Sequence, residues 1–256
     1  MARTFRQRAQ RLQRAAVLRY LKLTDSYAYE RRKHREWNHA RKRRYLAKYI
    51  PAGGVGAEVG VFWAHFSEIL HEDFAPSKLH LVDPWDLVAG EFFHFTSAYT
   101  LDGKLPTKVA MAAAQALAER SAGKVEVHRA YSYDFFPNLP DESLDWVYLD
   151  AAHSYEAVSE DLRHIWPKLK PTGILFGDDF FEGSIFPGVR RAVREFARLN
   201  EIPLAAGPYQ QYLLFRPDAP LPPIKTDDIV FQPEWRHRKA ARLQQAARAP
   251  KNPAEV

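Results

Sequence analysis

The chain has 256 residues, 46% of them hydrophobic, which is enough to bury the core of one large domain. It contains no cysteine, which excludes disulfide bonds and thiolate metal sites, and no apolar run approaches the ~18 residues that a membrane-spanning helix needs. Residues 1–50 hold 16 lysines and arginines against 3 acids, whereas residues 51–224 hold 14 against 24. The acidic centre argues against nucleic acid as the main ligand of the core.

The first 50 residues are predicted to form a basic helical arm, because apolar residues recur on one side before Pro51. The arginine-rich start lacks the apolar segment of a secretory signal, although organelle transit peptides share its composition. Together with the absence of cysteine, this favours a cytoplasmic protein. We expect the charged side of this helical arm mainly to face solvent. Contact with an anionic partner, such as RNA, a phospholipid surface or a sugar-phosphate carrier, and a homo-oligomer contact remain open.

Residues 51–217 are predicted to form an α/β domain in which strands alternate with helices. The short connections imply a Rossmann-like, mostly parallel sheet of seven strands with helices on both faces. Residues 218–256 are rich in proline and then basic, and we interpret them as a partly disordered tail. The expected strands are 55–61, 78–83, 124–131, 143–150, 173–179 and two within 202–217, and the expected helices are 65–74, 107–122, a segment that begins at Ser154, and 188–200.

Aspartates stand at the carboxyl ends of the predicted strands. Asp83 ends the second strand, Asp150 ends the fourth, and Asp178 and Asp179 end the fifth. Ligands of open parallel sheets bind at this edge, near the point where the strand order reverses. We therefore expect the four carboxylates to converge on one cleft, with His153 at its mouth.

The glycines do not fit a dinucleotide-binding fingerprint, because the GGVG run at 53–56 comes before the first strand ends rather than after it. No phosphate-binding Walker sequence is present either. The first strand instead carries Glu58 and Gly60, and Asp83 stands at the usual distance for an acid that binds ribose. A carboxylate in that place accepts hydrogen bonds from two adjacent ribose hydroxyls and so fixes a nucleoside.

Residues 51–217 resemble the class I S-adenosylmethionine-dependent methyltransferases. The resemblance rests on four segments, which read AEVGVFWAHFSE, LHLVDPWD, YSYDFFPNLPDESLDWVYLDAAHSYE and LKPTGILFGDDF. The subgroup that is most similar has an aspartate followed by a histidine-serine-tyrosine run, here DAAHSY at 150–155. The resemblance therefore implies a methyltransferase fold that binds S-adenosylmethionine.

The same resemblance implies roles for particular positions. It places the aromatic stretch 91–99 in the region of a substrate lid, with ordinary core packing as the alternative. The loop after the first strand has Ala64 where the family usually has a glycine. The implied cofactor contacts are Glu58 and Gly60 at the methionine end, Asp83 at the ribose, and Ser132 and Tyr133 at the adenine.

Asp150, Asp178 and Asp179 are three hard oxygen ligands that the fold is expected to bring together. Like charges in a cleft raise each other's pKa unless a cation compensates them. We therefore predict a divalent metal site, with Mg²⁺ as the expected ion and Mn²⁺ or Ca²⁺ as alternatives. The arrangement also resembles that of metal-dependent O-methyltransferases. The alternative is that Asp178 and Asp179 cap a turn and meet an arginine or lysine.

His153 is the candidate general base, because it lies three residues after Asp150 and imidazole suits proton transfer near neutral pH. A metal would acidify the acceptor hydroxyl while His153 takes its proton. The predicted reaction is therefore methylation of a hydroxyl on a small molecule or sugar. His128 and His164 are expected to have structural roles.

Two other functions compete with this prediction. An RNA methyltransferase is favoured only by the basic arm, because amine-directed enzymes carry an Asn/Asp-Pro-Pro-aromatic motif where this chain reads DAAH at 150–153. The second competing function is that of an interaction module, in which the methyltransferase fold is catalytically inactive. Equilibrium binding of S-adenosylmethionine would separate that module from an enzyme.

Overall fold

The structure is a computed structural model, and it describes residues 39–50, 52–85, 107–184, 186–221 and 229–232, with positions 12, 15, 16, 19, 20 and 22–24. The aromatic stretch 91–99, most of the arm and most of the tail therefore lie outside the described residues. Within the described part, no helix combines the length and apolar character needed to cross a membrane.

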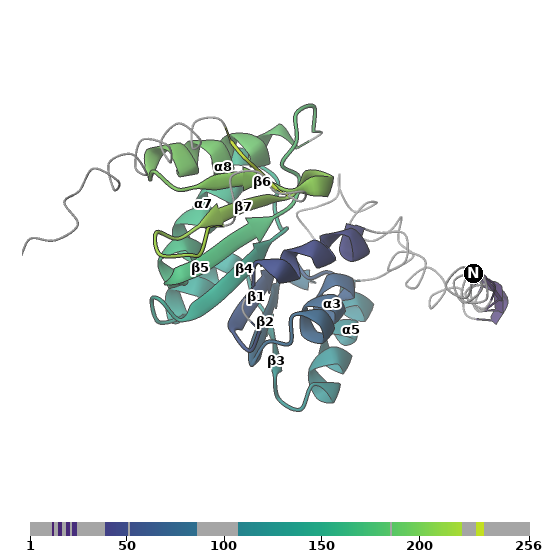
Figure 1. Cartoon of the computed structure of the whole chain (residues 1–256). Helices are drawn as coiled ribbons and strands as arrows, with labels where there is room; N and C mark the ends of the chain where they lie inside the picture. Colours follow the sequence, from purple (N-terminus) through teal and green to yellow (C-terminus); the bar gives the residue numbers. More distant parts are fainter. Residues whose placement is uncertain are drawn as a thin grey trace, which may run out of the picture.

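Eight strands form one sheet in the order β3-β2-β1-β4-β5-β7-β6-β8 (Figure 1). β1 to β5 are parallel, whereas β7 pairs antiparallel with β5 and β6, and β8 pairs antiparallel with β6. The predicted α/β class with a mostly parallel sheet is therefore confirmed. The strands are β1 (Val55–Val59), β2 (Lys78–Asp83), β3 (Val125–Arg129), β4 (Leu144–Leu149), β5 (Leu169–Gly177), β6 (Leu204–Ala206), β7 (Tyr212–Phe215) and β8 (Val230–Phe231).

The prediction of seven strands was one too few. β8 comes from the segment that we interpreted as tail, and its Phe231 is buried against the sheet. A two-residue strand is too short to show a period of two, so the sequence gives no local signal for it. β5 also begins at Leu169, earlier than expected, and its pairing with β4 shifts register near Trp146.

Helices cover both faces of the sheet. Leu46, Ile69 and Leu117 form one core layer, to which η1, α3 and α5 contribute. Leu162 and Val193 belong to the other, which α7 and α8 cover. The helices are η1 (His39–Lys48), α3 (His65–Asp73), α5 (Thr107–Arg120), α6 (Ser132–Phe135), η3 (Phe136–Asn138), α7 (Tyr155–Ile165), η4 (Trp166–Lys168), α8 (Pro187–Leu199) and η5 (Pro208–Gln210).

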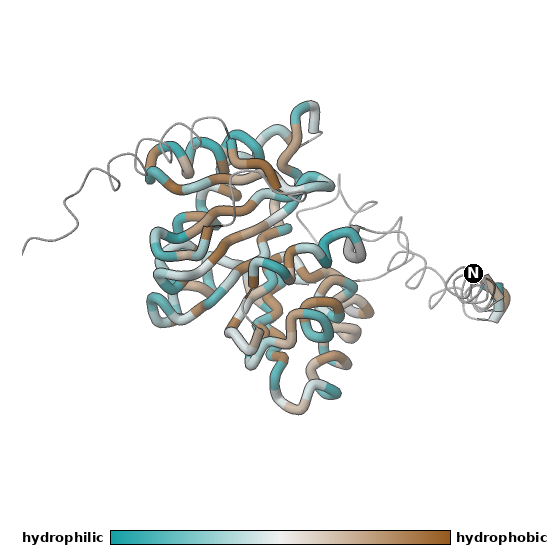
Figure 2. Tube along the Cα trace, in the orientation of Figure 1, coloured by the Kyte–Doolittle hydropathy of each residue, from teal (hydrophilic) through white to brown (hydrophobic). Residues whose placement is uncertain are grey.

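Strand β4 shows why the chain reads as buried on both sides. Trp146 and Tyr148 point into the core layer of α3 and α5, and Val147 and Leu149 point into the layer of α7 and α8. A strand covered on both faces has no polar face, so its sequence is a continuous apolar run. Figure 2 shows hydrophobic residues along the central strands.

The end of the basic arm packs on the domain rather than pointing away from it. η1 contacts α3, and Leu46 and Ile50 are buried between them and the sheet. Apolar side chains therefore anchor a segment that is otherwise rich in arginine and lysine. This position brings the charged residues of η1 to the sheet edge described below.

Replacing Leu46 by alanine should destabilise the protein by about 2–5 kcal/mol, the usual cost of a cavity left by a buried leucine. Chemical unfolding followed by circular dichroism measures this loss. Leu199→Ala is the matched control, because Leu199 is 65% exposed and Leu46 is fully buried. Equal stability of the two variants would mean that η1 is not docked on the domain.

Candidate active site at the carboxyl ends of the strands

The register of the sheet brings the predicted acidic residues to one edge. Val59 pairs with Val82 and Leu149, and Leu149 pairs with Gly177, so the residues that follow β1, β2, β4 and β5 are neighbours. The backbone N–H of Asp150 donates to the carbonyl of Val59 at 2.8 Å, which continues the ladder past the end of β4. The strand order reverses at this point between β1 and β4.

Gly60 is required where β1 ends. Its φ is +86°, in the left-handed region that favours glycine, and a Cβ there would overlap the backbone of Asp150. Ala64 has a φ of +63° at the position before α3, where the family usually has a glycine. With Phe62, whose φ is +53°, the loop between β1 and α3 therefore holds three left-handed residues beside the acidic edge.

Arg43 of η1 supplies a positive charge to this edge. Its Nη2 donates to Oδ2 of Asp150 at 3.1 Å and also to Oδ2 of Asp178. The guanidinium lies over the rings of Phe66 and Tyr148, 5.3 and 5.1 Å from their centres. The side chain is only 11% exposed, so the ion pairs are largely shielded from water.

Arg43 lowers the pKa of both aspartates, but the balance with burial differs between them. Burial raises the pKa of Asp150, but hydrogen bonds and charges from His153 and Arg43 outweigh it and hold that pKa below its ordinary value. Burial dominates for Asp178, so its pKa lies above the ordinary value although Arg43 opposes the rise. Gln211 also donates from Nε2 to Oδ1 of Asp178 at 2.8 Å, which satisfies the second carboxylate oxygen.

Asp179 turns away from its neighbour Asp178 and pairs with His153. A left-handed backbone, with a φ of +62°, follows β5 at Asp179. His153 Nε2 lies 2.9 Å from Oδ2 of Asp179 and 3.8 Å from Oδ1 of Asp150, and its ring stacks on Phe186. Burial lowers the pKa of His153, but the two carboxylates outweigh it and raise the pKa to about 9.

The predicted metal ligands therefore divide into two groups. Asp150, His153 and Asp179 each offer a ligand atom, and these atoms lie within 4.8 Å of one another. Asp178 is instead occupied by Arg43 and Gln211. Two carboxylates and an imidazole fit a divalent cation, and the nitrogen donor suits Mn²⁺ as well as the expected Mg²⁺, which prefers oxygen.

Asp83 and Glu58 are both buried at the same edge. Asp83 Oδ2 accepts from the backbone N–H groups of Val61 and Phe62, both at 2.9 Å, and Oδ1 accepts from that of Trp85 at 2.7 Å. A carboxylate has about four acceptor positions, so this tie to the loop leaves little capacity for a ligand. Burial raises the pKa of Glu58 to about 8, although the Ser67 hydroxyl donates to it.

Ser132 and Tyr133 lie just beyond β3, at the start of α6. The Ser132 hydroxyl donates to Asp161 of α7, whose pKa burial raises to about 6. Tyr133 is 43% exposed and stacks on Tyr131, with ring centres 5.0 Å apart. A flat aromatic pair beside the sheet edge is a surface on which a purine can stack.

Sequence reasoning missed Arg43, which pairs with two of the acids at this edge. It belongs to the run RKRR at 41–44, in which no single position stands out. The available signal was Leu46 and Ile50, apolar residues at the end of a basic segment, which indicate a docked turn. The sequence contains no signal that Gln211 is a partner of Asp178, because nothing marks this residue apart from its position directly before the buried strand β7.

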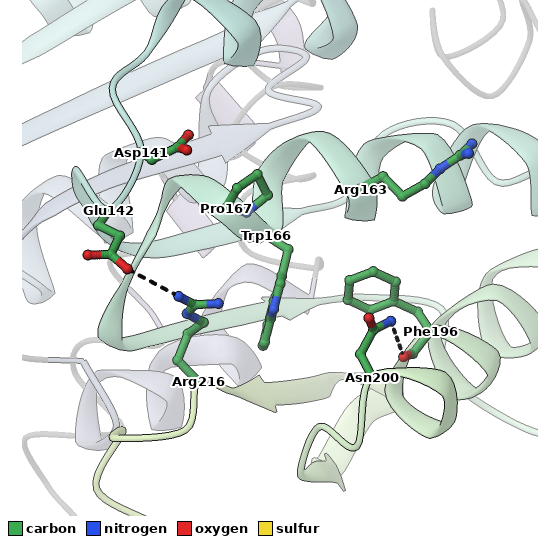
Figure 3. A pocket seen from close by; sticks show the side chains of 8 residues that line it. All are labelled: Asp141, Glu142, Arg163, Trp166, Pro167, Phe196, Asn200 and Arg216. Atoms are coloured by element: carbon green, nitrogen blue, oxygen red, sulfur yellow. Dashed lines mark hydrogen bonds and ion pairs between the residues drawn. The ribbon is translucent and has the colours of Figure 1, made fainter.

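A cavity lies away from this edge. It has a volume of about 490 Å³ and sits at the amino ends of β4 and β5, where Arg216 lies 3.6 Å from Glu142 (Figure 3). None of the predicted site residues contributes to it. It is lined by Asp141, Glu142, Arg163, Trp166, Pro167, Phe196, Asn200 and Arg216.

Residues 53–180 match the protein family described as "Methyltransferase domain". Among solved structures, the chain is similar to a protein from Corynebacterium glutamicum, with a TM-score of 0.51, 15% identity and coverage of 79% of this chain and 95% of that one. It is also similar to the O-methyltransferase NovP, with a TM-score of 0.50, 16% identity and coverage of 70% and 79%. These two similarities show the fold alone. No curated protein matches the sequence.

Replacing Arg43 by glutamine should cost about 3–5 kcal/mol of stability near neutral pH, because it leaves Asp178 buried without its counter-charge and Asp150 with that of His153 alone. The folded-state pKa of both acids would then rise. A raised acid pKa destabilises the fold above the unfolded pKa, so the deficit should shrink towards about pH 4 as the acids take up protons.

Urea unfolding of Arg43→Gln at several pH values measures this deficit. Lys42→Gln is the matched control, because Lys42 is exposed on the same helix and contacts only the ring of Tyr209 among the interactions described for it. A deficit that is the same at both ends of the pH range would show that the charge of Arg43 is not what stabilises the edge.

Proposed function

The chain belongs to the methyltransferase-domain family, and from that premise we propose that it transfers the methyl group of S-adenosylmethionine to a hydroxyl oxygen of a small molecule or sugar. The family confirms the resemblance to the class I S-adenosylmethionine-dependent methyltransferases. One observation carries the rest of the proposal: the matched region, residues 53–180, includes the acidic edge where β1, β2, β4 and β5 end.

The cofactor would lie across the ends of β1 and β2. The proposal places the methionine end beside Gly60, in the turn that follows β1. Asp83 would contact the ribose while it keeps the loop between β1 and α3 in place. Tyr133, with Ser132 beside it, would border the adenine from the start of α6, just beyond β3.

The acceptor would lie between the cofactor and His153. Methyl transfer to a hydroxyl needs a group that takes its proton, and His153 is oriented for this by Asp179 at 2.9 Å. The pKa of about 9 means that the neighbouring carboxylates hold a proton on the imidazole near neutral pH. For His153 to accept a proton, a positive charge must offset the two carboxylates, and the proposal therefore includes such a charge.

A divalent cation held by Asp150 and Asp179 would supply positive charge beside the acceptor hydroxyl and make its proton more acidic. The same positive charge would weaken the hold of the two carboxylates on the proton of His153. Asp178 is not included in this proposed set, because Arg43 and Gln211 already use its oxygens.

Calorimetric titration with S-adenosylmethionine tests the proposal at its first step. The wild type should bind, and Asp83→Ala should bind about 10- to 100-fold more weakly, because a charge-assisted hydrogen bond of ~1.5–3 kcal/mol to the ribose is lost. Asp141→Ala is the matched control, since Asp141 is exposed at the opposite end of the strands. Absence of binding by the folded wild type would refute the proposed function.

Turnover tests the roles of His153 and the cation. Radiolabelled methyl transfer to a panel of sugars and phenols should identify an acceptor, and His153→Gln should then lower the rate by about 10²–10⁴-fold with unchanged S-adenosylmethionine affinity. His164→Gln on the outer part of α7 is the control. Removal of divalent ions by EDTA should abolish turnover. Added Mg²⁺ or Mn²⁺ should restore turnover in the wild type, and should restore it less in Asp179→Asn. Full activity in EDTA would reject the cation.

A further inference from the structure

A second group of titratable side chains lies on the sheet itself, apart from the acidic edge. His80 is on β2, and Glu126 and His128 are on the edge strand β3. The register pairs His80 with Glu126, and residues 126 and 128 project to the same face because strand side chains alternate. The ring of Phe135 packs against both histidines on that face.

The three side chains converge on one point through a single atom each. Nδ1 of His80 lies 3.0 Å from Nε2 of His128 and 3.5 Å from Oε2 of Glu126, and Nε2 of His128 lies 3.8 Å from that oxygen. In tetrahedral zinc sites, bond lengths of about 2.0–2.2 Å place ligand atoms about 3.3–3.6 Å apart. The observed triangle therefore matches three ligands of one small cation to within a few tenths of an ångström.

The surroundings prepare these groups for metal binding. Lys78 Nζ pairs with Oε1 of Glu126 at 2.6 Å, which orients the carboxylate and leaves Oε2 facing the two imidazoles. Ligand carboxylates are commonly held by such a second partner. The ring of Phe135 packs on both imidazoles and helps to fix their orientation.

We propose that His80, Glu126 and His128 form a zinc site in which water occupies the fourth position. Two imidazole nitrogens and one carboxylate oxygen are donors that Zn²⁺ binds readily, whereas Mg²⁺ and Ca²⁺ prefer sites made of oxygen alone. The side chains become more exposed from His80 (9%) through His128 (27%) to Glu126 (43%), so solvent reaches the site from the edge of the sheet.

The zinc would join β3 to β2. β3 is the outermost strand on its side of the sheet, and it pairs with β2 alone among the described strands. A bond from each strand to one ion adds a link that the unfolded chain lacks, so binding stabilises the fold. The site contains none of the residues assigned to methyl transfer, and the two proposals therefore succeed or fail separately.

Zinc titration of tag-free, EDTA-stripped protein tests the site. The wild type should bind Zn²⁺, and His80→Gln and His128→Gln should each bind about 100-fold more weakly, since even loss of an outer partner costs 10–100-fold in metal affinity. His164→Gln should keep wild-type affinity. His153→Gln should also keep it at this site, which separates the site from the group of Asp150, His153 and Asp179.

A second measurement covers the case in which a histidine variant fails to fold. Glu126 is partly exposed, so Glu126→Gln should preserve the fold while it removes the anionic ligand. Zinc should raise the unfolding temperature of the wild type and of His153→Gln, and should raise that of Glu126→Gln much less. Equal zinc affinity in the wild type, His80→Gln and His128→Gln, or loss of all binding in His153→Gln, would overturn the proposal.

Discussion

The ion pairs of Arg43 with Asp150 and Asp178 are the interaction on which the acidic edge depends. Parallel strands that end together force their terminal carboxylates into one place, and burial there penalises each negative charge. Arg43 comes from η1, 107 residues before Asp150, and lies between the two acids. The chain thus provides from its own arm part of the positive charge that sequence reasoning assigned to a metal ion.

This arrangement changes the role of each predicted ligand. Asp178 is bound by Arg43 and Gln211, while Asp179 turns through a left-handed backbone towards His153. Two adjacent aspartates in the sequence therefore do different work, one in holding η1 to the sheet and the other in orienting a candidate base. A cation at Asp150 and Asp179 would lie beside Arg43, so its affinity would depend on how η1 is docked.

The parts of the fold that could be predicted are those with a local cause. Apolar runs that end in Asp83 and Asp150 indicate buried strands, and α7 begins where a helix was expected, with Ser154 as its N-cap accepting from the N–H of Ala157. The rest depends on contacts between distant positions. The sequence predicted only a structural role for His128, because its proximity to His80, 48 residues earlier, depends on the register of β2 with β3. Arg43 was not predicted for the same reason, since its partners are also distant in the sequence.

The account rests on cofactor binding at the carboxyl edge, and a crystal structure of the chain with S-adenosylhomocysteine tests this most directly. We predict density across the ends of β1 and β2, with a ribose hydroxyl within hydrogen-bond reach of Asp83 and the sulfur on the side of Asp150 and His153. Density for the ligand in the cavity lined by Trp166 and Arg216, or an edge that stays empty at saturating ligand, would contradict the account.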